Sequence, residues 1–537
     1  MTSLPRSSTP ASPWQRAGLW VLSGLAGLLL FRVVLLMLLA DRGVGLHVDE
    51  AQYWWWSRDL QWGYFSKPPG IAALISLSTA LFGDSVVGIR VLPALCWIVT
   101  AWALWALGCA MHAPRAGAWA ALLLCTSVAS NWLGMVATTD AWLMTFWALA
   151  MLVTWHAQSL PTDAPPLRRA AWWALAGAVL GLAALGKYTA GALAASWVWL
   201  WWRRRASSSH ALAGPTLQAP TLPDLLIAGI ATALVVLPHL LWNFFNDWPT
   251  LRHTAEITLQ GGAAPPTDGP RTAGDRLHSF AEFFGGQWLL AGPALAVALL
   301  VMLVRSLQGR KAASPWADLR VRWALAFSLP LLLVGFAQAL HAKAQVNWAL
   351  PMLLGLCMAA GLWTEQRRVR PWLMLMLGGI TVALTAAISL HGDARLWRAP
   401  ESKPGAPDVW GRMRGWGEAL ATLQPALQAN AGQPVVATDR SVMAQALYAW
   451  RDEQRRFMSW SPDGTIRHHF DWKLPISTAT GSSTPCSVLF VDNEVPERFM
   501  PGATRTRLAQ ARAGRVDLSL WQVTALPTDP PCARVQR

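Results

Sequence analysis

The residue types best suited to chemistry are concentrated in one short segment, residues 47–70. It reads His47-Val-Asp49-Glu50-Ala-Gln-Tyr53-Trp-Trp-Trp56 and continues to Trp62-Gly-Tyr64-Phe65-Ser-Lys67-Pro68-Pro69-Gly70. A carboxylate that is shielded by aromatic rings at a membrane surface can act as a general base toward a hydroxyl or an amine. The two adjacent acids can equally cap a short helix that begins near Ala51. Two of the chain's four tyrosines also fall in this segment, which favours a functional site.

Lysine usage is the second chemical signal. The chain has 44 lysines and arginines, of which only six are lysines. Three of the six, Lys67, Lys187 and Lys343, fall on one side of the membrane in the topology described below. An ammonium group can neutralise a phosphate. Snorkelling to the interface is the alternative, but it explains Lys187 least well, because this residue lies inside an apolar block where charge is costly.

Further polar residues stand at the ends of apolar segments. Asp140 begins one such segment, where it either interacts with the helix dipole or lines the same cavity as Asp49. His341 and Lys343 precede Asn347 between two apolar segments. These residues either bind an anionic group or simply mark the membrane interface.

The sequence contains no recognisable metal or nucleotide motif. His47, His239 and His253 do not have the spacing of metal ligands. A Walker loop, a dinucleotide-binding glycine pattern and a Ser-His-Asp signature are all missing. We therefore expect no required cofactor, and a divalent ion held by the acids at 49, 50 or 140 is an open alternative without support.

The composition is that of a membrane protein. Hydrophobic residues make up 54% of the 537-residue chain and charged residues only 14%, against about 25% charged residues in a typical soluble domain. The mean hydropathy is +0.31, which argues against a water-soluble enzyme. The 35 tryptophans suit membrane interfaces, where one end of the ring is apolar and the N–H is wet.

Apolar runs predict about eleven transmembrane helices. The first, 19–40, is too long for the core of a cleaved signal peptide, so we interpret it as a retained anchor. Ten more are expected at 87–108, 117–134, 140–158, 170–186, 189–202, 224–242, 287–304, 323–341, 347–363 and 371–391. The run 70–83 is too short to span and is expected to be re-entrant or interfacial. Arg32 and Arg90 lie in apolar surroundings, so each is expected to pair with an acid or with backbone carbonyls.

Positive charge orients these segments. With the N-terminus in the cytoplasm, every inner loop carries arginine, which accounts for the net charge of +15 without nucleic acid. The outer loops instead mix acids, lysine, histidine and asparagine: Asp49, Glu50, Lys67, Asp140, Lys187, Asn243, Asp247, His341, Lys343 and Asn347. This asymmetry predicts that separate outer loops build one site.

The chain is expected to have two domains, a transmembrane domain at 1–391 and a soluble domain at 392–537 outside the cytoplasm. In the second, 433–438, 486–491 and 516–523 are predicted strands and 441–450 a predicted helix, which indicates an α/β domain. Cys486 and Cys532 lie in this domain, and whether they pair stays open. Segments 206–223 and 261–275 are expected to be loops.

The ordered motifs resemble those of the GT-C glycosyltransferases, in the branch called family 39, which includes protein O-mannosyltransferases and the lipid A aminoarabinose transferase. Asp49-Glu50-Ala-x-Tyr53 followed by Gly63-Tyr64-Phe65-x-Lys67-Pro68-Pro69 is similar to the first outer loop of that branch. Weaker matches follow in order: Arg90-Val-Leu-Pro93, Thr139-Asp140-Ala-Trp-Leu, Gly186-Lys187-Tyr188-Thr189, Trp242-Asn243 with Asp247-Trp248, Gln287 leading to Pro293, Asn347-Trp348 and Gly415-Trp416. The resemblance spans roughly 19–420.

The resemblance implies a GT-C membrane fold and a polyprenyl-phosphate-linked sugar donor, used at the outer face of the bacterial inner membrane. It implies catalytic acids at Asp49, with its neighbour Glu50, and at Asp140. Lys67 and Lys187 match positions that face the donor phosphate. We expect Tyr188 to lie at the same site and Lys343 or Arg252 to add charge there. The residues expected to line the substrate cavity are Tyr53, Tyr64, Asn243, His341 and Asn347. Many bacterial members carry histidine at the position of Lys67, whereas the aminoarabinose transferase carries lysine, and this does not fix the sugar.

The chemistry of the residues agrees with this expectation. A phosphate leaving group needs positive charge rather than a general acid, and an acceptor needs a base. We therefore expect inverting transfer to an envelope acceptor, which is lipid A or another glycolipid, a polysaccharide or a protein. A transporter or flippase is the alternative. It is disfavoured because the polar residues lie at helix ends on one side rather than at mid-helix. A non-catalytic scaffold would not need the Asp-Glu and lysine combination.

Overall fold

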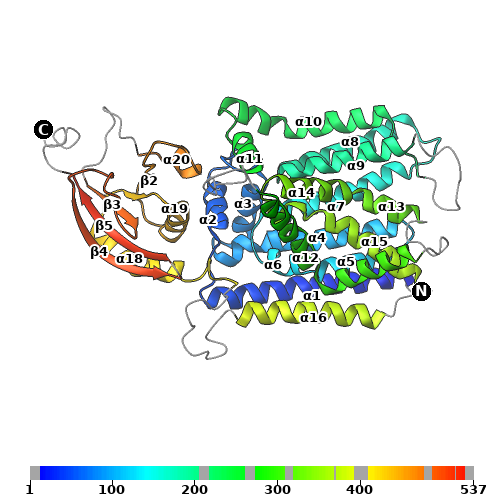
Figure 1. Ribbon diagram of the computed structural model, residues 1–537, viewed down its shortest axis with the longest axis horizontal. Coiled ribbons are helices and arrows are strands. Elements are labelled where there is room, and N and C mark those ends of the chain that lie inside the picture. Colours follow the sequence, from blue (N-terminus) through cyan, green and yellow to red (C-terminus); the bar gives the residue numbers. More distant parts are fainter. Residues whose placement is uncertain are drawn as a thin grey trace, which may run out of the picture.

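The computed structural model consists of a long helical part with a sheet-containing part at one end (Figure 1). It describes residues 13–204, 217–259, 272–308, 318–367, 371–391, 409–476, 487–514 and 516–525. Helix α1, which begins at Pro13, starts at the end of the helical part that is remote from the sheet (Figure 1). The possible pairing of Cys486 with Cys532 lies outside the described residues.

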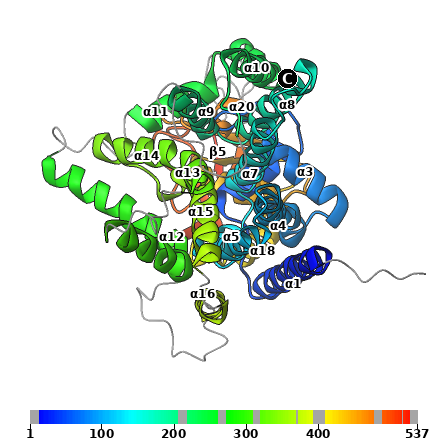
Figure 2. The ribbon, with the colours of Figure 1, turned by 90° about the vertical axis from the view of Figure 1, so that its right-hand side faces the viewer.

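The helical part runs from α1 to α16. Its elements within the described ranges are α1 (Pro13–Asp41), α2 (Val48–Ser57), α3 (Gly70–Phe82), α4 (Val86–Ala110), α5 (Pro114–Cys125), α6 (Val128–Leu133), α7 (Thr139–Gln158), α8 (Pro166–Ala184), η1 (Tyr188–Ala190), α9 (Gly191–Arg204), α10 (Leu222–Phe245), α11 (Pro249–Leu259), α12 (Ala273–Leu307), α13 (Leu319–Ala326), α14 (Leu329–His341), η4 (Val346–Ala349), α15 (Met352–Gln366) and α16 (Pro371–His391), where η marks a short 3-10 helix. Seen from the end, α1 and α16 lie at the edge of this bundle (Figure 2).

A helix lies at every predicted crossing, which confirms a multi-pass membrane protein. By length and composition, five of the described helices can each cross a membrane alone, and α13 and α14, which are bent by 41° relative to each other, pass the same test only as a pair. The predicted crossings at 117–134 and 323–341 are each divided between two helices, α5 and α6 in the first and α13 and α14 in the second. In the first case the chain breaks between α5 and α6, where the Ser127 hydroxyl accepts the Ser130 N–H and begins a new helix. The 13-residue α3 is too short to span, as predicted.

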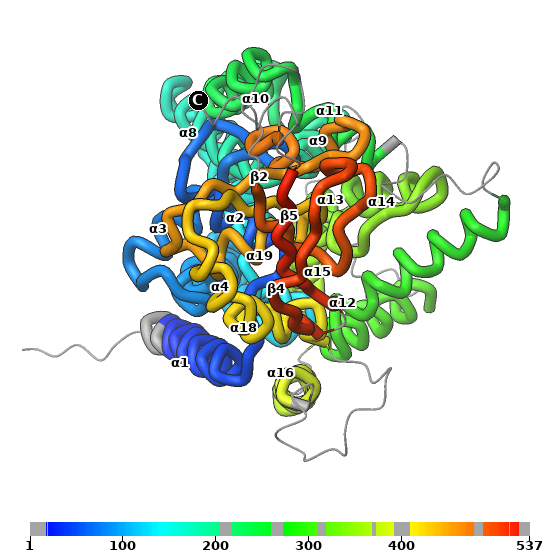
Figure 3. Tube along the Cα trace, turned by 90° about the vertical axis from the view of Figure 1, so that its left-hand side faces the viewer, coloured from blue at the N-terminus to red at the C-terminus, as the bar shows by residue number. Residues whose placement is uncertain are grey.

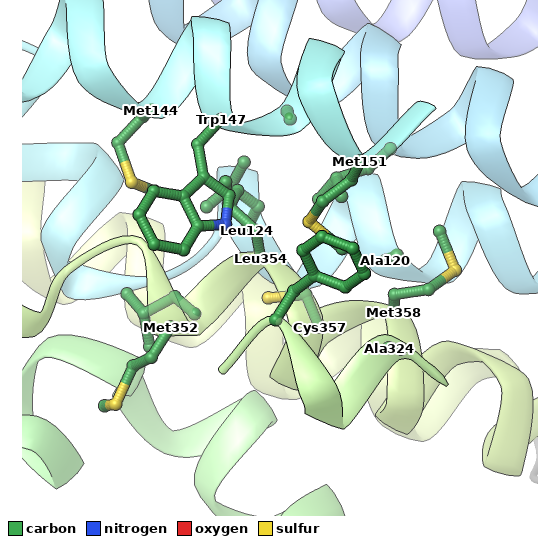
Figure 4. Packing of buried hydrophobic residues seen from close by; sticks show 14 of the residues in the cluster. Ala120, Leu124, Met144, Trp147, Met151, Ala324, Met352, Leu354, Cys357 and Met358 are labelled. Carbon is green, nitrogen blue, oxygen red and sulfur yellow. The ribbon is translucent and has the colours of Figure 1, made fainter. Parts of the chain in front are cut away.

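Close helix packing explains the small residues of the bundle. A Cβ placed on Gly117 of α5 would lie 2.6 Å from the Trp105 carbonyl oxygen of α4. The two backbones therefore meet directly, which only small residues permit. Met144, Trp147 and Met151 of α7 belong to one buried cluster with residues of α5 and with Cys357 of α15 (Figure 4).

The second part is a five-stranded mixed sheet with the strand order β2-β1-β3-β5-β4. The strands are β1 (Val435–Ala437), β2 (Phe457–Ser459), β3 (Ser487–Asp492), β4 (Thr504–Ala513) and β5 (Val516–Thr524), and the helices are α18 (Trp416–Ala429), α19 (Arg440–Ala449) and α20 (His469–Lys473). The pairs β1–β2 and β1–β3 are parallel, whereas β3–β5 and β4–β5 are antiparallel. The predicted α/β class, three strands and helix are confirmed.

The sheet part docks on the first outer loop and shares its hydrophobic core. Trp54, Trp56 and Tyr64 belong to one buried cluster with Val442 and Phe470 of the sheet part. In Figure 1, α2 and α3 lie between the sheet part and the remaining helices, and Figure 3 views the same junction from the sheet side. The loop that carries Asp49 is therefore held from both sides.

Candidate active site

The short helix α2 sets the directions of the two adjacent acids. His47 precedes it as the N-cap, and its ring nitrogen Nδ1 accepts the Asp49 N–H at 3.2 Å. In return the Glu50 carboxylate accepts the His47 N–H at 2.8 Å, which completes a capping box. Successive residues of a helix point about 100° apart, so Glu50 faces the protein while Asp49 faces outward.

Glu50 has a structural role in this arrangement, which argues against its predicted place among the catalytic acids. Its carboxylate accepts hydrogen bonds from Arg90 Nε at 2.8 Å and Nη2 at 2.7 Å, and from the Ala137 N–H at 2.7 Å. Both side chains of the pair are at most 2% exposed. A carboxylate so fully engaged and so buried cannot reach an acceptor. The cap alternative therefore holds for Glu50, and the expected pairing of Arg90 with an acid is found.

Asp49 is the accessible carboxylate of the first loop. Its side chain is 42% exposed, and Oδ1 lies 2.9 Å from Nη2 of Arg440, at the start of α19. Oδ2 lies 3.6 Å from Nδ1 of His47, a nitrogen that already accepts the Asp49 N–H and so carries no proton there. The Asp49 carboxylate therefore remains accessible from the space beside the membrane.

Asp140 joins three separate connections between helices. It lies in the first turn of α7 and is 1% exposed. Its Oδ1 lies 2.8 Å from Nζ of Lys187, just before η1, and its Oδ2 accepts a hydrogen bond from Asn347 Nδ2 of η4 at 2.9 Å. Three residues that were predicted on the same side are therefore brought together, with Asp140 as their common acceptor.

Lys67 supplies positive charge that no neighbouring side chain neutralises. Burial, together with the nearby Lys187 ammonium, lowers the pKa of Lys67 to about 8, although Asp49 and Asp140 oppose this shift. Across the described ranges no acid forms an ion pair with its ammonium. Burial and Lys67 also lower the pKa of His253 to about 4, so this imidazole is neutral at pH 7. Such a buried ammonium is suited to an anionic ligand.

Two tyrosines of the first loop have different surroundings. Tyr53 is buried beside Asp49, and burial followed by the Asp49 charge raises its pKa well above the usual value. The Tyr64 hydroxyl instead contacts the carbonyls of Trp56 at 3.1 Å and Asp59 at 3.2 Å, and its ring stacks on Trp56 at 4.5 Å. Tyr64 therefore fixes the loop through its hydroxyl, and its predicted place in the substrate cavity stays a prediction.

A buried polar chain braces the same loop from α10. The Tyr188 hydroxyl lies 2.6 Å from Nε2 of His239, whose Nδ1 lies 2.6 Å from the Trp62 carbonyl. Since a carbonyl only accepts, Nδ1 carries the proton and Nε2 accepts from Tyr188. Asn243 accepts the Thr250 N–H at 3.3 Å. Tyr188 and Asn243 thus hold an imidazole and backbone, and their predicted places at the donor phosphate and in the cavity stay predictions.

Three further predicted residues are peripheral in the structure. His341, Lys343 and Arg252 are exposed, and none of the described hydrogen bonds or ion pairs joins them to Asp49, Asp140 or Lys67. Their predicted contributions therefore stay predictions. Asn347, from the same connection as Lys343, does reach the site.

The sheet part contributes residues that no sequence motif indicated. Arg440 contacts Asp49, and His469 of α20 accepts the Phe65 N–H at 3.3 Å. Burial and the Lys473 charge lower the pKa of His469 to about 3, so it is neutral and acts as an acceptor. These residues follow the last matched motif, and only the fold brings them to the loop.

Metal ligands are not clustered in the part of the chain that the structure describes: no group of three His, Cys, Asp or Glu side chains could hold an ion there. Asp49 and Asp140 are instead each paired with a cation. This geometry does not favour the open metal alternative.

Comparisons with known proteins agree with this geometry. A family model described as dolichyl-phosphate-mannose-protein mannosyltransferase matches residues 66–242. A lipid A galacturonosyltransferase, RgtD of Rhizobium johnstonii, is 28% identical over 471 residues, which are 86% of this chain and 88% of that protein. The crystal structure of ArnT from Cupriavidus metallidurans bound to undecaprenyl phosphate aligns with a TM-score of 0.60 at 15% identity, over 93% of this chain and 98% of that one.

The chain thus has the fold of ArnT, and its sequence is similar to that of a lipid A galacturonosyltransferase. The same ArnT in its apo state aligns with a TM-score of 0.56 at 14% identity, over 94% of this chain and 98% of that one. The predicted GT-C membrane fold with a soluble α/β domain is therefore confirmed, as is the assignment as a glycosyltransferase. The transporter alternative is not favoured.

Proposed function

We propose that this GT-C enzyme moves a sugar from a polyprenyl-phosphate donor to a hydroxyl or amine of lipid A or a related glycolipid. The observation that carries the proposal is that an accessible carboxylate, Asp49, lies within electrostatic range of the Lys67 ammonium, with which no acid in the described residues forms an ion pair. One group can take a proton from the acceptor, and the other can bind the donor phosphate. Glycosyl transfer from a phosphate needs both functions.

We assign the donor phosphate to Lys67, with Lys187 as the nearest second cation. Lys187 is held by Asp140 at 2.8 Å, and Asn347 fixes Asp140. Asp140 is therefore a positioning residue in this proposal. ArnT, which shares the fold, was crystallised with undecaprenyl phosphate bound, and this ligand supports a polyprenyl phosphate as the carrier of the sugar here.

The reaction is a single displacement at the anomeric carbon. The Asp49 carboxylate accepts the proton of the acceptor O–H or N–H as that atom forms its bond to the anomeric carbon. The bond between the anomeric carbon and the phosphate oxygen breaks, and the electron pair leaves with the polyprenyl phosphate. The charge that develops on the phosphate is stabilised by Lys67. One displacement inverts the anomeric configuration.

The sugar is proposed to carry a carboxylate. The relative from Rhizobium johnstonii is named a lipid A galacturonosyltransferase, so a uronic acid as the transferred group and lipid A as the acceptor are supported by its name. Several cations lie around the site, because the charges of Lys187 and Arg440 both lower the pKa of Lys67. Such a concentration of positive charge favours an acidic sugar over a basic one.

The site is proposed to face the outside of the bacterial inner membrane. The connection between α4 and α5 lies at the end of the helices remote from the sheet part (Figure 1). Arg115 follows it in the first turn of α5, and the positive-inside rule puts that end in the cytoplasm. The soluble domain, proposed at 392–537, is then periplasmic and follows the transmembrane domain at 1–391. A fusion of alkaline phosphatase after Thr524 should be active, whereas one after Arg115 should be inactive; the reverse pattern would contradict this orientation.

The proposed function is tested by a transfer assay with the purified full-length chain in lipid. Radiolabelled polyprenyl-phosphate sugars, covering uronosyl, neutral hexosyl and aminopentosyl donors, are each supplied with lipid A. Label should move to lipid A from a uronosyl donor. Failure to consume any donor on this panel, with folded protein, would overturn the proposal.

The Lys67 charge also makes donor use dependent on pH. Because the pKa of Lys67 is lowered to about 8, its ammonium is charged below that pH and neutral above it. We expect kcat/KM for the donor to fall as pH rises through about 8, since this quantity reports the free enzyme. In Lys67→Arg the fall should move to higher pH, because arginine stays protonated.

The control for this pH profile is Lys473→Arg, because Lys473 stacks on the Trp472 ring instead of facing the assigned phosphate position. Its profile should match that of the wild type. An unmoved basic limb in Lys67→Arg would exclude the proposed role of the Lys67 charge.

A further inference from the structure

Arg440 reaches the active site from the soluble domain in a well-fixed position. Asp439, the N-cap of α19, accepts the N–H groups of Ser441 at 2.7 Å and Val442 at 3.0 Å, which fixes the first turn. Further along α19, the Gln445 amide donates to the Leu46 carbonyl at 2.8 Å in a buried contact just before α2. Helix α19 is thus tied to the start of α2, and the Arg440 guanidinium is presented to the first loop.

The guanidinium of Arg440 is only partly used by the protein. Nη2 lies 2.9 Å from Asp49 Oδ1, and Nη1 donates to Gln52 Oε1 at 3.3 Å. A guanidinium carries five N–H donors, so these contacts leave it able to bind a second acceptor. The side chains of Arg440 and Asp49 are 36% and 42% exposed. An incoming ligand can therefore reach the pair without dismantling the core.

The other two cations near Asp49 have different tasks. Lys187 is 12% exposed and is held by Asp140. Lys67 is assigned to the donor phosphate in the proposed function. The charge of Arg440 acts to lower the pKa of both Tyr53 and Lys67. Arg440 therefore lies within electrostatic range of the space between Asp49 and the assigned phosphate position, where the donor sugar must sit.

The reaction itself creates a need for a second anion at Arg440. When Asp49 accepts the proton of the acceptor, its carboxylate becomes neutral and the guanidinium loses its charged partner. A carboxylate on the donor sugar would replace that partner at the moment of transfer. Guanidinium and carboxylate match each other in a two-point geometry, which an ammonium does not offer.

We propose that Arg440, supplied by the soluble domain, recognises the carboxylate of a uronic acid donor and so determines which sugar is transferred. This inference rests on the proposed transfer from a polyprenyl-phosphate donor. It makes the soluble domain part of the sugar site, not merely a cover over it.

The inference is tested by the charge selectivity of transfer. Two donors are compared on the same polyprenyl phosphate, one with a uronosyl group and one with the neutral hexose that carries CH2OH in place of the carboxylate. The ratio of kcat/KM for the two donors is measured in wild type, Arg440→Gln and Arg440→Lys. We expect this ratio to fall about 10- to 100-fold in Arg440→Gln, the range for losing a hydrogen bond to a charged group, and to be partly retained in Arg440→Lys. Arg512→Gln, on the exposed edge strand β4, is the control and should keep the wild-type ratio.

The outcomes separate this inference from the function on which it rests. If Arg440→Gln lowers transfer from both donors equally, Arg440 acts through Asp49 or the phosphate, and the specificity role is overturned while glycosyl transfer stands. If the wild type transfers the neutral sugar as readily as the uronosyl sugar, the role is overturned as well. If Arg440→Gln is inactive, the test stays decisive, because the same selectivity is measured without turnover from the competition of the two donors for binding.

Discussion

Replacement of Asp49 by asparagine should reduce the rate of sugar transfer by about 100- to 10,000-fold, the usual contribution of a positioned general base. Asparagine preserves the shape of the side chain and can still contact the Arg440 region, but it cannot accept the acceptor proton. Because Asp49 is 42% exposed and outside the core, the variant should fold normally. The measurement is single-turnover transfer of label from a polyprenyl-phosphate donor.

A matched control comes from the same loop. Asp59 is exposed and accepts a hydrogen bond from Gln61 Nε2 at 2.7 Å, so Asp59→Asn removes a carboxylate without touching the site. It should transfer at close to the wild-type rate. Wild-type transfer by Asp49→Asn would exclude Asp49 as the base.

Replacement of Glu50, only one residue further along, should instead damage the fold. Glu50→Gln leaves the buried Arg90 charge without its partner and weakens the cap of α2. Breaking a buried ion pair in this way costs about 3–5 kcal/mol of stability. We expect a clearly lower Tm in detergent and little folded protein, and any protein that does fold should retain donor binding.

The pair can be tested by removing both charges. Glu50→Gln combined with Arg90→Met should recover part of the lost Tm, since no uncompensated charge then remains buried. The predicted contrast would be contradicted if Glu50→Gln had a wild-type Tm and lost only catalysis. In that case Glu50 would belong to the catalytic set after all.

The helical architecture was largely predictable because long apolar runs have few other solutions in a membrane. The breaks were not, since they depend on single contacts. The division between α5 and α6 follows from the Ser127 cap. The kink of α12 lies at Gly292, which has a φ of 72° and is followed by Pro293. Strand β4 was missed because its alternating arginines and small residues form an edge rather than a buried run.

The site was predictable as a set of residues more than as a set of roles. Asp49, Lys67, Asp140 and Lys187 could be grouped because charge asymmetry put their loops on one side of the membrane. The roles of Asp49 and Glu50 could not be separated, since they depend on which side of α2 each faces and on Arg90, forty residues away. Arg440 lies 391 positions after Asp49, in a tail without a recognised motif, so only the docking of α19 on α2 reveals it.

The central claim, a single displacement with Asp49 as the base, is tested most directly by the anomeric configuration of the product. A donor of defined configuration is converted by the wild-type enzyme, and the new linkage on lipid A is assigned from its anomeric proton coupling by NMR. We predict a product of inverted configuration. A product of retained configuration would require a covalent intermediate or a second displacement, and it would contradict the role given to Asp49.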